Sequence, residues 1–457
     1  MNKIIRVLVP SGVLGLGFDP KALADAVALK PDVICIDGGS TDSGPNSLGT
    51  STSKYSRAVC LREWRQLMRA RAQLDVPLII GSAGTCGTDD MVDWMFDITR
   101  EIAAGEERQG NRPLKVARLY TEQDNTIVAC AFAQQRIKPL EPQLPLDADT
   151  IDSCEHIVAL AGAEQIQAAL ATGADIIIAG RTTDTAVVSA LPLMRRCHAG
   201  AAWHAAKIAE CGALCSTHPT SGVIIVDIDQ SGFTIYPTAA GARCTPQSVS
   251  AHMLYENTDP FILYEPGGHL DVRHTHYEAQ GDAQVRVTGS QWVPTSPYTL
   301  KLEGARLVGY QTILLALLRH PHYVTHAKAW VNRLTGFLKR EISVSLELPE
   351  DRYEIEFRLI GVDATLGKLE TRSAEGVETG VLVIVTASSQ AEADEIGKLI
   401  NPFLLHYPLT DEEPLPTFAF PYSPAQTSRG PLFGFCLNHV LQLDDPMSAV
   451  RLEVTTL

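Results

Sequence analysis

The sequence lacks the apolar run of roughly 18 residues that a membrane-spanning helix requires, so we expect no transmembrane segment. Basic residues are few, because 38 Lys and Arg stand against 53 Asp and Glu, a formal net charge of -15. Such an acidic chain, without Lys/Arg runs among aromatic residues, disfavours binding to nucleic acid or anionic lipid. The sequence therefore predicts a cytoplasmic protein with no nucleic-acid or membrane partner.

Several well-defined catalytic and cofactor motifs are also missing. The chain has no G-x-x-x-x-G-K-[ST] phosphate loop and no G-x-S-x-G turn, which disfavours P-loop nucleotidases and ordinary α/β-hydrolases. The glycine-rich stretch GSAGTCG, residues 81–87, departs from the dinucleotide-binding pattern, and no acidic residue ends a strand about twenty positions later. We therefore expect no nucleotide cofactor.

The ten cysteines include no C-x-x-C pair. Several lie in apolar surroundings, as in VICID and TIVACAFA, which is typical of buried thiols in a reducing compartment. Cys211 and Cys215, followed by His218, have a spacing that a zinc site could use, but no second pair of ligands is evident. Buried free thiols are the favoured interpretation.

The first two hundred residues alternate short apolar runs with amphipathic segments. Residues 4–10 (IIRVLVP) have the length of a core strand and not that of a signal peptide. Further strands are expected at 32–37, 76–84, 115–122 and 174–180, with helices at 21–30, 56–74, 89–103, 163–173 and 184–196. Strands that alternate with helices of this length predict right-handed crossovers and a mainly parallel sheet.

The composition changes near residue 214, where β-rich stretches such as GVIIVDID and GFTIYPT begin. The stretches EISVSLEL (341–348), YEIEFRLIG and GVLVIVTAS predict strands, and residues 390–406 predict a helix; GFCLNHVLQL is predicted as the last strand. The expected class is α/β, with a mainly parallel domain at 1–214, a mixed α+β domain at 215–340 and a ferredoxin-like module at 341–457.

Four loops are expected at the carboxyl ends of the predicted parallel strands: residues 38–49, 81–87, 121–125 and 180–185. All four are rich in Gly, Ser, Thr or Asp. Ligands of open parallel sheets bind at this edge, where loop amides and helix N-termini favour an anion. Small residues also make tight turns, but four such loops on one edge favour a ligand site.

The loop residues suggest acid–base chemistry on a carboxylate. Arg181, three residues before Asp184, offers a bidentate fork for a substrate carboxylate. Asp42 or Asp184 could take a proton, although either could equally cap a turn or helix. Glu122 and Asp124 are weaker candidates. Arg181, Asp42 and Asp184 are our predicted catalytic residues.

The predicted substrate-binding residues supply amides and hydroxyls around the same edge. The amides of the Gly38–Gly39 and Gly81–Ser82 pairs are expected to stabilise developing negative charge. Glu210 ends a helix and could face the site, although a plain helix stop at Gly212 is an equal interpretation. The full predicted set is Gly38, Gly39, Ser40, Thr41, Gly81, Ser82, Thr182, Thr183 and Glu210.

The stretch GGHLDVRHTH offers Asp271, His274 and His276 as ligands for a divalent metal. An exposed polar strand is the favoured interpretation of this stretch. A metal-dependent version of the chemistry would use Asp37, Asp42 or His274. We assign no metal ligand, and the need for a divalent metal stays open.

Six stretches resemble the acyclic terpene utilisation AtuA family in order and spacing, over roughly residues 5–345. They are DGGSTDSGPNSLG, AGRTTDTAVVSALP, KIAECGALC, SVSAHMLYENTDPFILYEPGGHLDV, VRVTGSQWVP and YTLKLEGARLVGYQT. The C-terminal part is similar to the ferredoxin-fold module that accompanies this family. Some relatives carry AGSTDPGP where this chain has GGSTDSGP, and two aromatic residues where it has Asn46 and Ser47, so substrate identity is not transferred.

The resemblance implies a role in the catabolism of branched acyclic terpenes, a route that runs through acyl-CoA thioesters. It suggests a lyase or hydro-lyase that acts on a small (hydroxy) carboxylic acid or an acyl-CoA thioester. A noncatalytic acid-binding or scaffold subunit of a multienzyme complex is the alternative. From its size and class, we expect a homo-oligomer.

Overall fold

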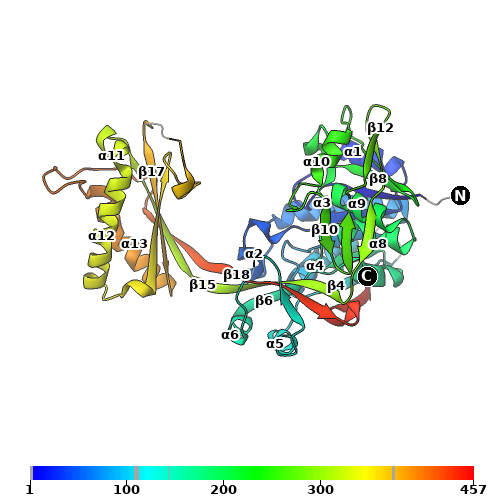
Figure 1. Ribbon diagram of the computed structural model, residues 1–457, viewed down its shortest axis with the longest axis horizontal. Helices are drawn as coiled ribbons and strands as arrows, with labels where there is room; N and C mark the ends of the chain where they lie inside the picture. The colour runs from blue at the N-terminus through cyan, green and yellow to red at the C-terminus, as the bar shows by residue number, and fades with distance from the viewer. Residues whose placement is uncertain (1–3, 108–112, 143, 373–375) are drawn as a thin grey trace. The chain divides into compact units, whose positions relative to one another are not determined.

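The computed structural model describes residues 4–107, 113–142, 144–372 and 376–457 (Figure 1). Residue contacts divide the chain into two compact units. The first comprises Met1–Arg306 and Phe435–Leu457, and the second comprises Leu307–Gly434. Two long strands, β15 (Tyr298–Leu318) and β18 (Gln426–Leu443), carry the chain from one unit to the other.

The first unit is built on a large mixed sheet. In the described residues its order is β12 (His276–Gln280), β13 (Gln284–Thr288), β9 (Gly232–Pro237), β8 (Ile224–Ile228), β1 (Ile5–Val9), β2 (Val33–Asp37), β3 (Leu78–Gly81), β7 (Ile176–Ala179), β4 (Lys115–Tyr120) and β19 (Arg451–Thr456). The run from β1 to β4 is parallel, as predicted. β8 pairs antiparallel with β1, from Ile5 opposite Ile228 onward. The composition change near residue 214 therefore marks a switch from parallel to antiparallel strands, and the predicted boundary falls within one sheet.

Helices cover both faces of the parallel strands. Val33 and Cys35 of β2 pack in one buried cluster, whereas Ile34 and Ile36 pack in another, because successive side chains of a strand point to opposite faces. The first cluster includes α7 (Ala163–Ala171), α8 (Asp184–Met194) and α9 (Ala199–Ala209); the second includes α1 (Pro20–Ala28), α3 (Arg57–Leu74) and α4 (Asp89–Glu107). Burial on both faces explains why these strands are continuous apolar runs.

Smaller elements complete the first unit. They are α2 (Asn46–Thr50), α5 (Asn125–Ala133), α6 (Ala148–Asp152), α10 (Pro246–His252), β5 (Ile137–Pro139), β6 (Cys154–Ala159), β10 (Ile262–Glu265), β11 (Gly268–Asp271) and β14 (Gln291–Pro294). β10, β11 and β14 form a separate antiparallel sheet. His274 precedes β12 and His276 begins it, and both side chains are exposed.

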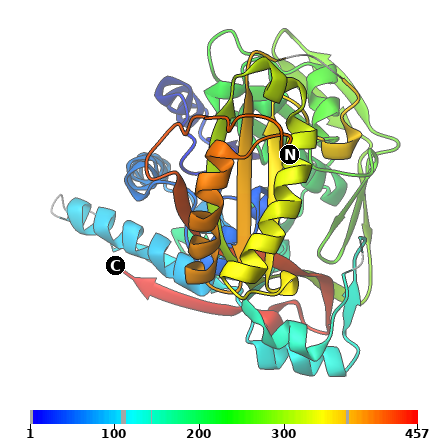
Figure 2. The same cartoon turned by 90° about the vertical axis from the view of Figure 1, so that its left-hand side faces the viewer.

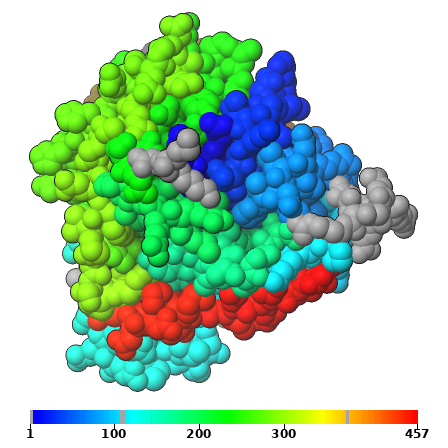
Figure 3. All heavy atoms as spheres, turned by 90° about the vertical axis from the view of Figure 1, so that its right-hand side faces the viewer, coloured from blue at the N-terminus to red at the C-terminus, as the bar shows by residue number. Residues whose placement is uncertain are grey.

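The C-terminal strand differs from the prediction. Residues 434–443 lie in β18, as expected for a strand, but the chain continues to β19, which pairs antiparallel with β4. In Figure 3 the C-terminal residues, in red, form a band across the surface beside the cyan segment that holds α5 and α6. An apolar run ends at Leu443, whereas β19 (RLEVTT) mixes polar and apolar residues and gave a weaker strand signal.

The second unit has the element order strand, helix, strand, strand, helix, strand. After β15 come α11 (Pro321–Thr325), α12 (Ala327–Ser345), β16 (Tyr353–Ile360), β17 (Thr379–Ala387), α13 (Gln390–His406) and β18. Its sheet runs β16-β17-β15-β18. Figure 2 shows α12 (yellow) and α13 (orange) side by side on one face of this sheet, where they bury Leu314, Val381 and Val383.

The strand predicted for residues 341–348 is wrong, because residues 341–345 form the last turn of α12. Leu334, Leu338 and Ile342 recur every four residues and are all buried, which is the spacing of one face of a helix. The unit therefore begins with β15 and α12, upstream of the predicted boundary at residue 341. In the part of the chain that the structure describes, no helix combines the length and apolar character needed to cross a membrane.

Candidate functional site

A pocket of about 620 Å³ lies in the first unit, where the loops after β1, β2 and β7 meet. Asp37, Ser40, Asp42, Asp184 and Glu210 all line it. Other lining residues are Ser11, Gly12, Val13, Leu16, Gly17, Ser43, Lys54, Tyr55, Cys211, Leu214, Pro219, Thr220, Gly222, Tyr255 and Glu256. The pocket thus lies at the sheet edge where the sequence predicted a ligand site.

Asp37, the last residue of β2, presents a buried carboxyl group to this pocket. Its side chain is 5% exposed. Oδ2 accepts a hydrogen bond from the Gly39 amide at 2.9 Å, whereas Oδ1 has no partner among the described residues. Burial raises the pKa of Asp37 well above its usual value, and the charge of Asp184 raises it further. Asp37 therefore has a carboxyl oxygen that is free to accept a hydrogen bond, and its raised pKa favours the protonated form.

Asp184, the first residue of α8, is the second carboxyl group of the pocket. The preceding Thr183 caps the helix, because its Oγ1 accepts from the Ala186 amide. Burial raises the pKa of Asp184 to about 6, against the opposing charge of Arg181. At neutral pH Asp184 is therefore mostly ionised, whereas burial favours the protonated form of Asp37. The two groups interact through charge, since the charge of Asp184 raises the pKa of Asp37.

A second charged cluster adjoins Asp184 and includes Glu210. Lys207 of α9 donates to Glu210 Oε1 at 2.7 Å, and both side chains are buried. Burial would lower the pKa of Lys207, but Glu210 outweighs burial and raises it. Burial raises the pKa of Glu210 to about 8 and that of Glu265 to about 7. The ammonium group of Lys207 thus interacts with three carboxyl groups, those of Asp184, Glu210 and Glu265. The net charge of the cluster is close to zero only when some of these carboxyl groups are protonated.

We expect Glu210→Gln to reduce the pH dependence of stability between pH 5 and 8. The folded state keeps a proton on Glu210 up to about pH 8, whereas the unfolded chain releases it near about pH 4.3. The raised pKa therefore stabilises the fold fully at low pH, and this stabilisation is lost as pH rises through 8. Urea unfolding at pH 5 and 8 should show a wild-type loss of stability larger by about 3–4 kcal/mol than that of Glu210→Gln. The exposed Glu155→Gln should keep the wild-type slope; equal slopes in all three proteins would contradict this expectation.

Arg181 does not line the pocket. Its side chain is 6% exposed, and its guanidinium contacts Glu303 of β15, with Nε 3.0 Å from Oε2 and Nη2 3.4 Å from Oε1. It also donates to Ser82 Oγ at 3.0 Å and to Thr41 Oγ1 at 3.4 Å. Thr41 itself donates to Glu303 Oε2 at 3.0 Å. Arg181 therefore connects three strand-end loops to β15. Its guanidinium already binds Glu303 and is not free to bind a substrate carboxylate.

Burial alone would raise the pKa of Glu303, but the charges of Arg181 and Lys301 lower it to about 2. Lys301 Nζ lies 3.2 Å from Glu303 Oε1. Glu303 is thus ionised across the physiological range and compensates the buried charge of Arg181.

Several predicted amide donors are already engaged. The Gly38 amide donates to the Gly81 carbonyl at 2.8 Å, and the Ser82 amide donates to the Gly180 carbonyl at 2.8 Å. The Gly39 amide donates to Asp37. Gly38 also has no room for a side chain, because a Cβ would lie 2.6 Å from the Ser82 carbonyl oxygen. The glycines let neighbouring loops approach closely, and the amides of Gly38, Gly39 and Ser82 are not directed at a ligand.

The other predicted residues divide between pocket and scaffold. Asp42 lies exposed at the rim, and Ser40 accepts a hydrogen bond from the Asp42 amide at 3.1 Å. Thr41, Gly81, Ser82 and Thr182 are buried beneath the pocket lining. The structure therefore brings Ser40, Asp42, Asp184 and Glu210 to the pocket and uses most of the rest to join loops.

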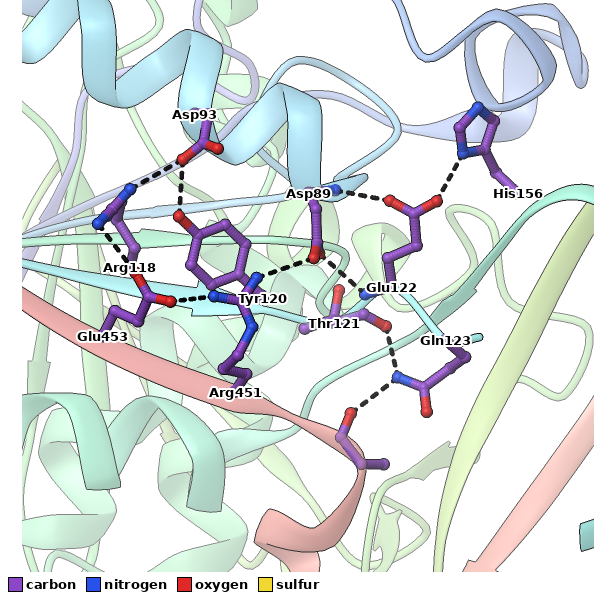
Figure 4. Close-up of polar contacts among 11 residues, drawn as sticks. Asp89, Asp93, Arg118, Tyr120, Thr121, Glu122, Gln123, His156, Arg451 and Glu453 are labelled. Atoms are coloured by element: carbon purple, nitrogen blue, oxygen red, sulfur yellow. Dashed lines mark hydrogen bonds and ion pairs between the residues drawn. The ribbon is translucent and has the colours of Figure 1, made fainter. Parts of the chain in front are cut away.

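The third predicted loop serves a different network, shown in Figure 4. Glu122 accepts from the Asp89 amide at 2.8 Å and lies 2.5 Å from His156 Nδ1. Its hydrogen bond raises the pKa of His156. Nearby, Arg451 of β19 contacts Asp89. Asp124 caps α5 and does not line the pocket. This network attaches β19 to β4 and α4.

No metal centre is evident among residues 4–107, 113–142, 144–372 and 376–457, because no three His, Cys, Asp or Glu side chains are grouped to hold an ion. Cys215 shares a hydrogen bond with Cys244.

A larger cavity, about 960 Å³, lies in the second unit beside α12 and the loop after β16. The strand-end pocket, unlike this cavity, is lined by the buried Asp37 and the partly buried Asp184.

Sequence reasoning gave Asp37 too little weight and missed Glu303, Lys207 and Glu265. Asp37 and Glu303 carry a usable signal, since each is an acid next to buried apolar residues of a strand, in VICID and LKLEG. A buried acid of this kind needs a partner or a function. Lys207 and Glu210 are three apart on α9, which predicts contact on one helix face.

The sequence model of the family described as "Acyclic terpene utilisation family protein AtuA" matches residues 49–411, well over half of the chain. The chain belongs to the AtuA family. No curated protein and no solved structure matches it. For this AtuA protein, the matched region includes Lys54, Asp184, Glu210 and Glu303, and it begins after Asp37. Membership of a family named for acyclic terpene utilisation indicates a catabolic role.

Proposed function

We propose that the pocket is the active site of a lyase or hydro-lyase that acts on a small (hydroxy) carboxylic acid or an acyl-CoA thioester. One observation carries the proposal: the buried Asp37 and the partly buried Asp184 line one pocket, and one oxygen of Asp37 has no partner among the described residues. Pairs of carboxyl groups whose pKa values are pushed apart supply an acid and a base at one pH.

The proposed chemistry uses these two groups in opposite roles. Asp184, mostly ionised at neutral pH, removes a proton from the carbon next to the carbonyl. Asp37, whose burial favours the protonated form, gives its proton to the departing hydroxyl, so that water leaves as the carbon–carbon double bond forms. The reverse sequence hydrates the double bond. No charge is left uncompensated in either direction.

Lys54 replaces Arg181 as the proposed contact for the substrate's anionic group. Arg181 is occupied by Glu303, whereas Lys54 is exposed at the pocket and is the one basic residue among its described lining residues. A carboxylate or CoA phosphate at Lys54 would leave the reacting carbon free to reach Asp37 and Asp184. Arg181 then acts as a positioning residue for Thr41 and Ser82.

Solvent deuterium exchange tests this proposal even while the product is unidentified. Hydroxy acids and acyl-CoA thioesters are incubated with the protein in D2O, and proton NMR follows the carbon next to the carbonyl. We expect at least one compound to exchange or to lose water with wild-type protein and not with Asp184→Asn. Exchange that is equally fast in both proteins would contradict the role of Asp184.

The alternative function is a noncatalytic acid-binding or scaffold subunit, and the second unit favours it. We propose that this unit is a ferredoxin-like module, from its element order and its β16-β17-β15-β18 sheet. The sheet face that points away from α12 and α13 carries Ile313, Leu315, Leu382 and Ile384, all partly exposed. Such a face suits a protein partner. A stable complex without any turnover would favour this alternative.

We propose further that the protein works in the cytoplasm as a homo-oligomer. All ten cysteines are free thiols, which suits a reducing compartment. Light scattering of the purified protein measures the oligomeric state directly, and a monomer at micromolar concentration would contradict it.

A further inference from the structure

Two buried thiols meet in the first unit, and neither lines the pocket. Cys154 of β6 and Cys436 of β18 have their Sγ atoms 3.0 Å apart, although 282 positions separate them. Their side chains are 6% and 5% exposed. A disulfide needs the sulfurs at about 2.05 Å, so an approach of about 1 Å separates the thiol pair from a covalent bond.

Gly304 of β15 makes this contact possible. β15 pairs with β6, Arg306 lying opposite Cys154, and it neighbours β18 in the sheet. A Cβ on Gly304 would lie 3.2 Å from Cys154 Sγ and 2.7 Å from Leu437 Cδ1. Because the glycine carries no side chain, the two sulfurs have the space in which they meet.

The position of the pair in the chain gives a disulfide a structural consequence. Arg306 is the last residue of the first unit before the chain enters the second, and Phe435, next to Cys436, is the first residue after it returns. A bond between Cys154 and Cys436 would join β6 to β18 at the end of the first unit where both connecting strands leave it.

We propose that Cys154 and Cys436 are a site of reversible oxidation, at which hydrogen peroxide converts two thiols into one disulfide that ties β6 to β18. Peroxide oxidises the Cys436 sulfur to a sulfenic acid and is itself reduced, releasing one water. The Cys154 sulfur then attacks that sulfur, the S–S bond forms, and the sulfenic hydroxyl leaves as a second water. A dithiol reductant reverses the reaction.

The electrostatic environment supports Cys436 as the first sulfur to react. The hydrogen bond from Cys154 lowers the pKa of the Cys436 thiol, and the positive charge of Arg306 acts in the same direction. The same hydrogen bond raises the pKa of Cys154, so Cys154 keeps its proton more strongly and Cys436 is the thiol that peroxide oxidises first.

Mass spectrometry of the full-length wild-type protein tests the proposal directly. The protein is treated with peroxide, alkylated, and digested without reductant. The exposed thiol of Cys130 serves as an internal gauge of the oxidant dose. We expect a peptide pair linked through Cys154 and Cys436 that dithiothreitol removes, and a rise in Tm of at least about 2 °C in the oxidised protein.

Cys436→Ser should lose both the linked peptide and the Tm rise, whereas the matched Cys130→Ser should keep both. The proposal is overturned if, at a dose that oxidises Cys130, Cys154 and Cys436 are recovered only as separate alkylated thiols or sulfinic acids. The wild-type digest decides the question even where Cys436→Ser folds poorly.

Discussion

The Asp184→Asn protein is expected to fold normally and to lose about 10²–10⁴-fold of its kcat, the usual contribution of a positioned general base. Asparagine keeps the shape of the side chain and cannot accept a proton from carbon. Asp184 begins α8, and Thr183 caps that helix, so the substitution leaves the cap in place. Turnover and solvent exchange of any compound identified by NMR measure the effect, and Tm confirms folding.

The matched control is Asp124→Asn. Asp124 also lies after a strand and at the start of a helix, but it caps α5 away from the pocket. Asparagine is an equally good cap, so this variant should keep wild-type stability and turnover. If Asp184→Asn and Asp124→Asn are equally active, the pocket carboxyl group is not the base.

The second large effect is structural: Arg181→Ala should lower the free energy of unfolding by about 3–5 kcal/mol. The substitution leaves the ionised Glu303 buried without its main partner and releases Thr41 and Ser82. Arg181→Lys keeps the charge but not the fork, so its loss should be smaller. Urea unfolding followed by tryptophan fluorescence reports this loss, because four of the five tryptophans, all except Trp330, lie in the first unit.

Arg57→Ala provides the matched control for Arg181→Ala. Arg57 pairs with Glu101 at 2.8 Å, but both side chains are about half exposed. An exposed pair of this kind contributes about 0–1 kcal/mol. A loss below about 1 kcal/mol for Arg181→Ala as well would mean that Arg181 is free to bind a substrate, as the sequence alone suggested.

Much of the fold was predictable, because a strand that is buried on both faces of a sheet appears in the sequence as a continuous apolar run. VICID and ADIIIAG are continuous apolar runs followed by polar loops, and both are parallel strands of the central sheet. The sequence could not show that β8 pairs with β1, because the apolar residues of β8 would equally suit a strand of a second sheet. The sequence analysis predicted a strand at the end of α12 because EISVS is rich in β-branched residues, which favour strands. The buried residues four positions apart, which pack against the sheet, instead make this segment the last turn of the helix.

The sequence predicted the location of the candidate pocket well, but it predicted the roles of the individual residues less well. Polar residues after parallel strands located the edge, and Asp184 and Glu210 do reach the pocket. The environment of Arg181 depends on Glu303, 122 positions later in the chain, and no local pattern records that pairing. Asp37 looked like the end of a strand, and only the structure shows its burial and its unpartnered oxygen, on which the proposed role rests.

We propose that ligands bind at the strand-end pocket of the first unit. Hydrogen–deuterium exchange mass spectrometry, with and without hydroxy acids, dicarboxylic acids and acyl-CoA thioesters, tests it most directly. We predict that a binding compound protects segments around residues 37–43 and 210–222, and that Asp184→Asn weakens this protection. Protection confined to the cavity beside α12, at residues 324–329 and 360–365, would contradict the account and place the functional site in the second unit.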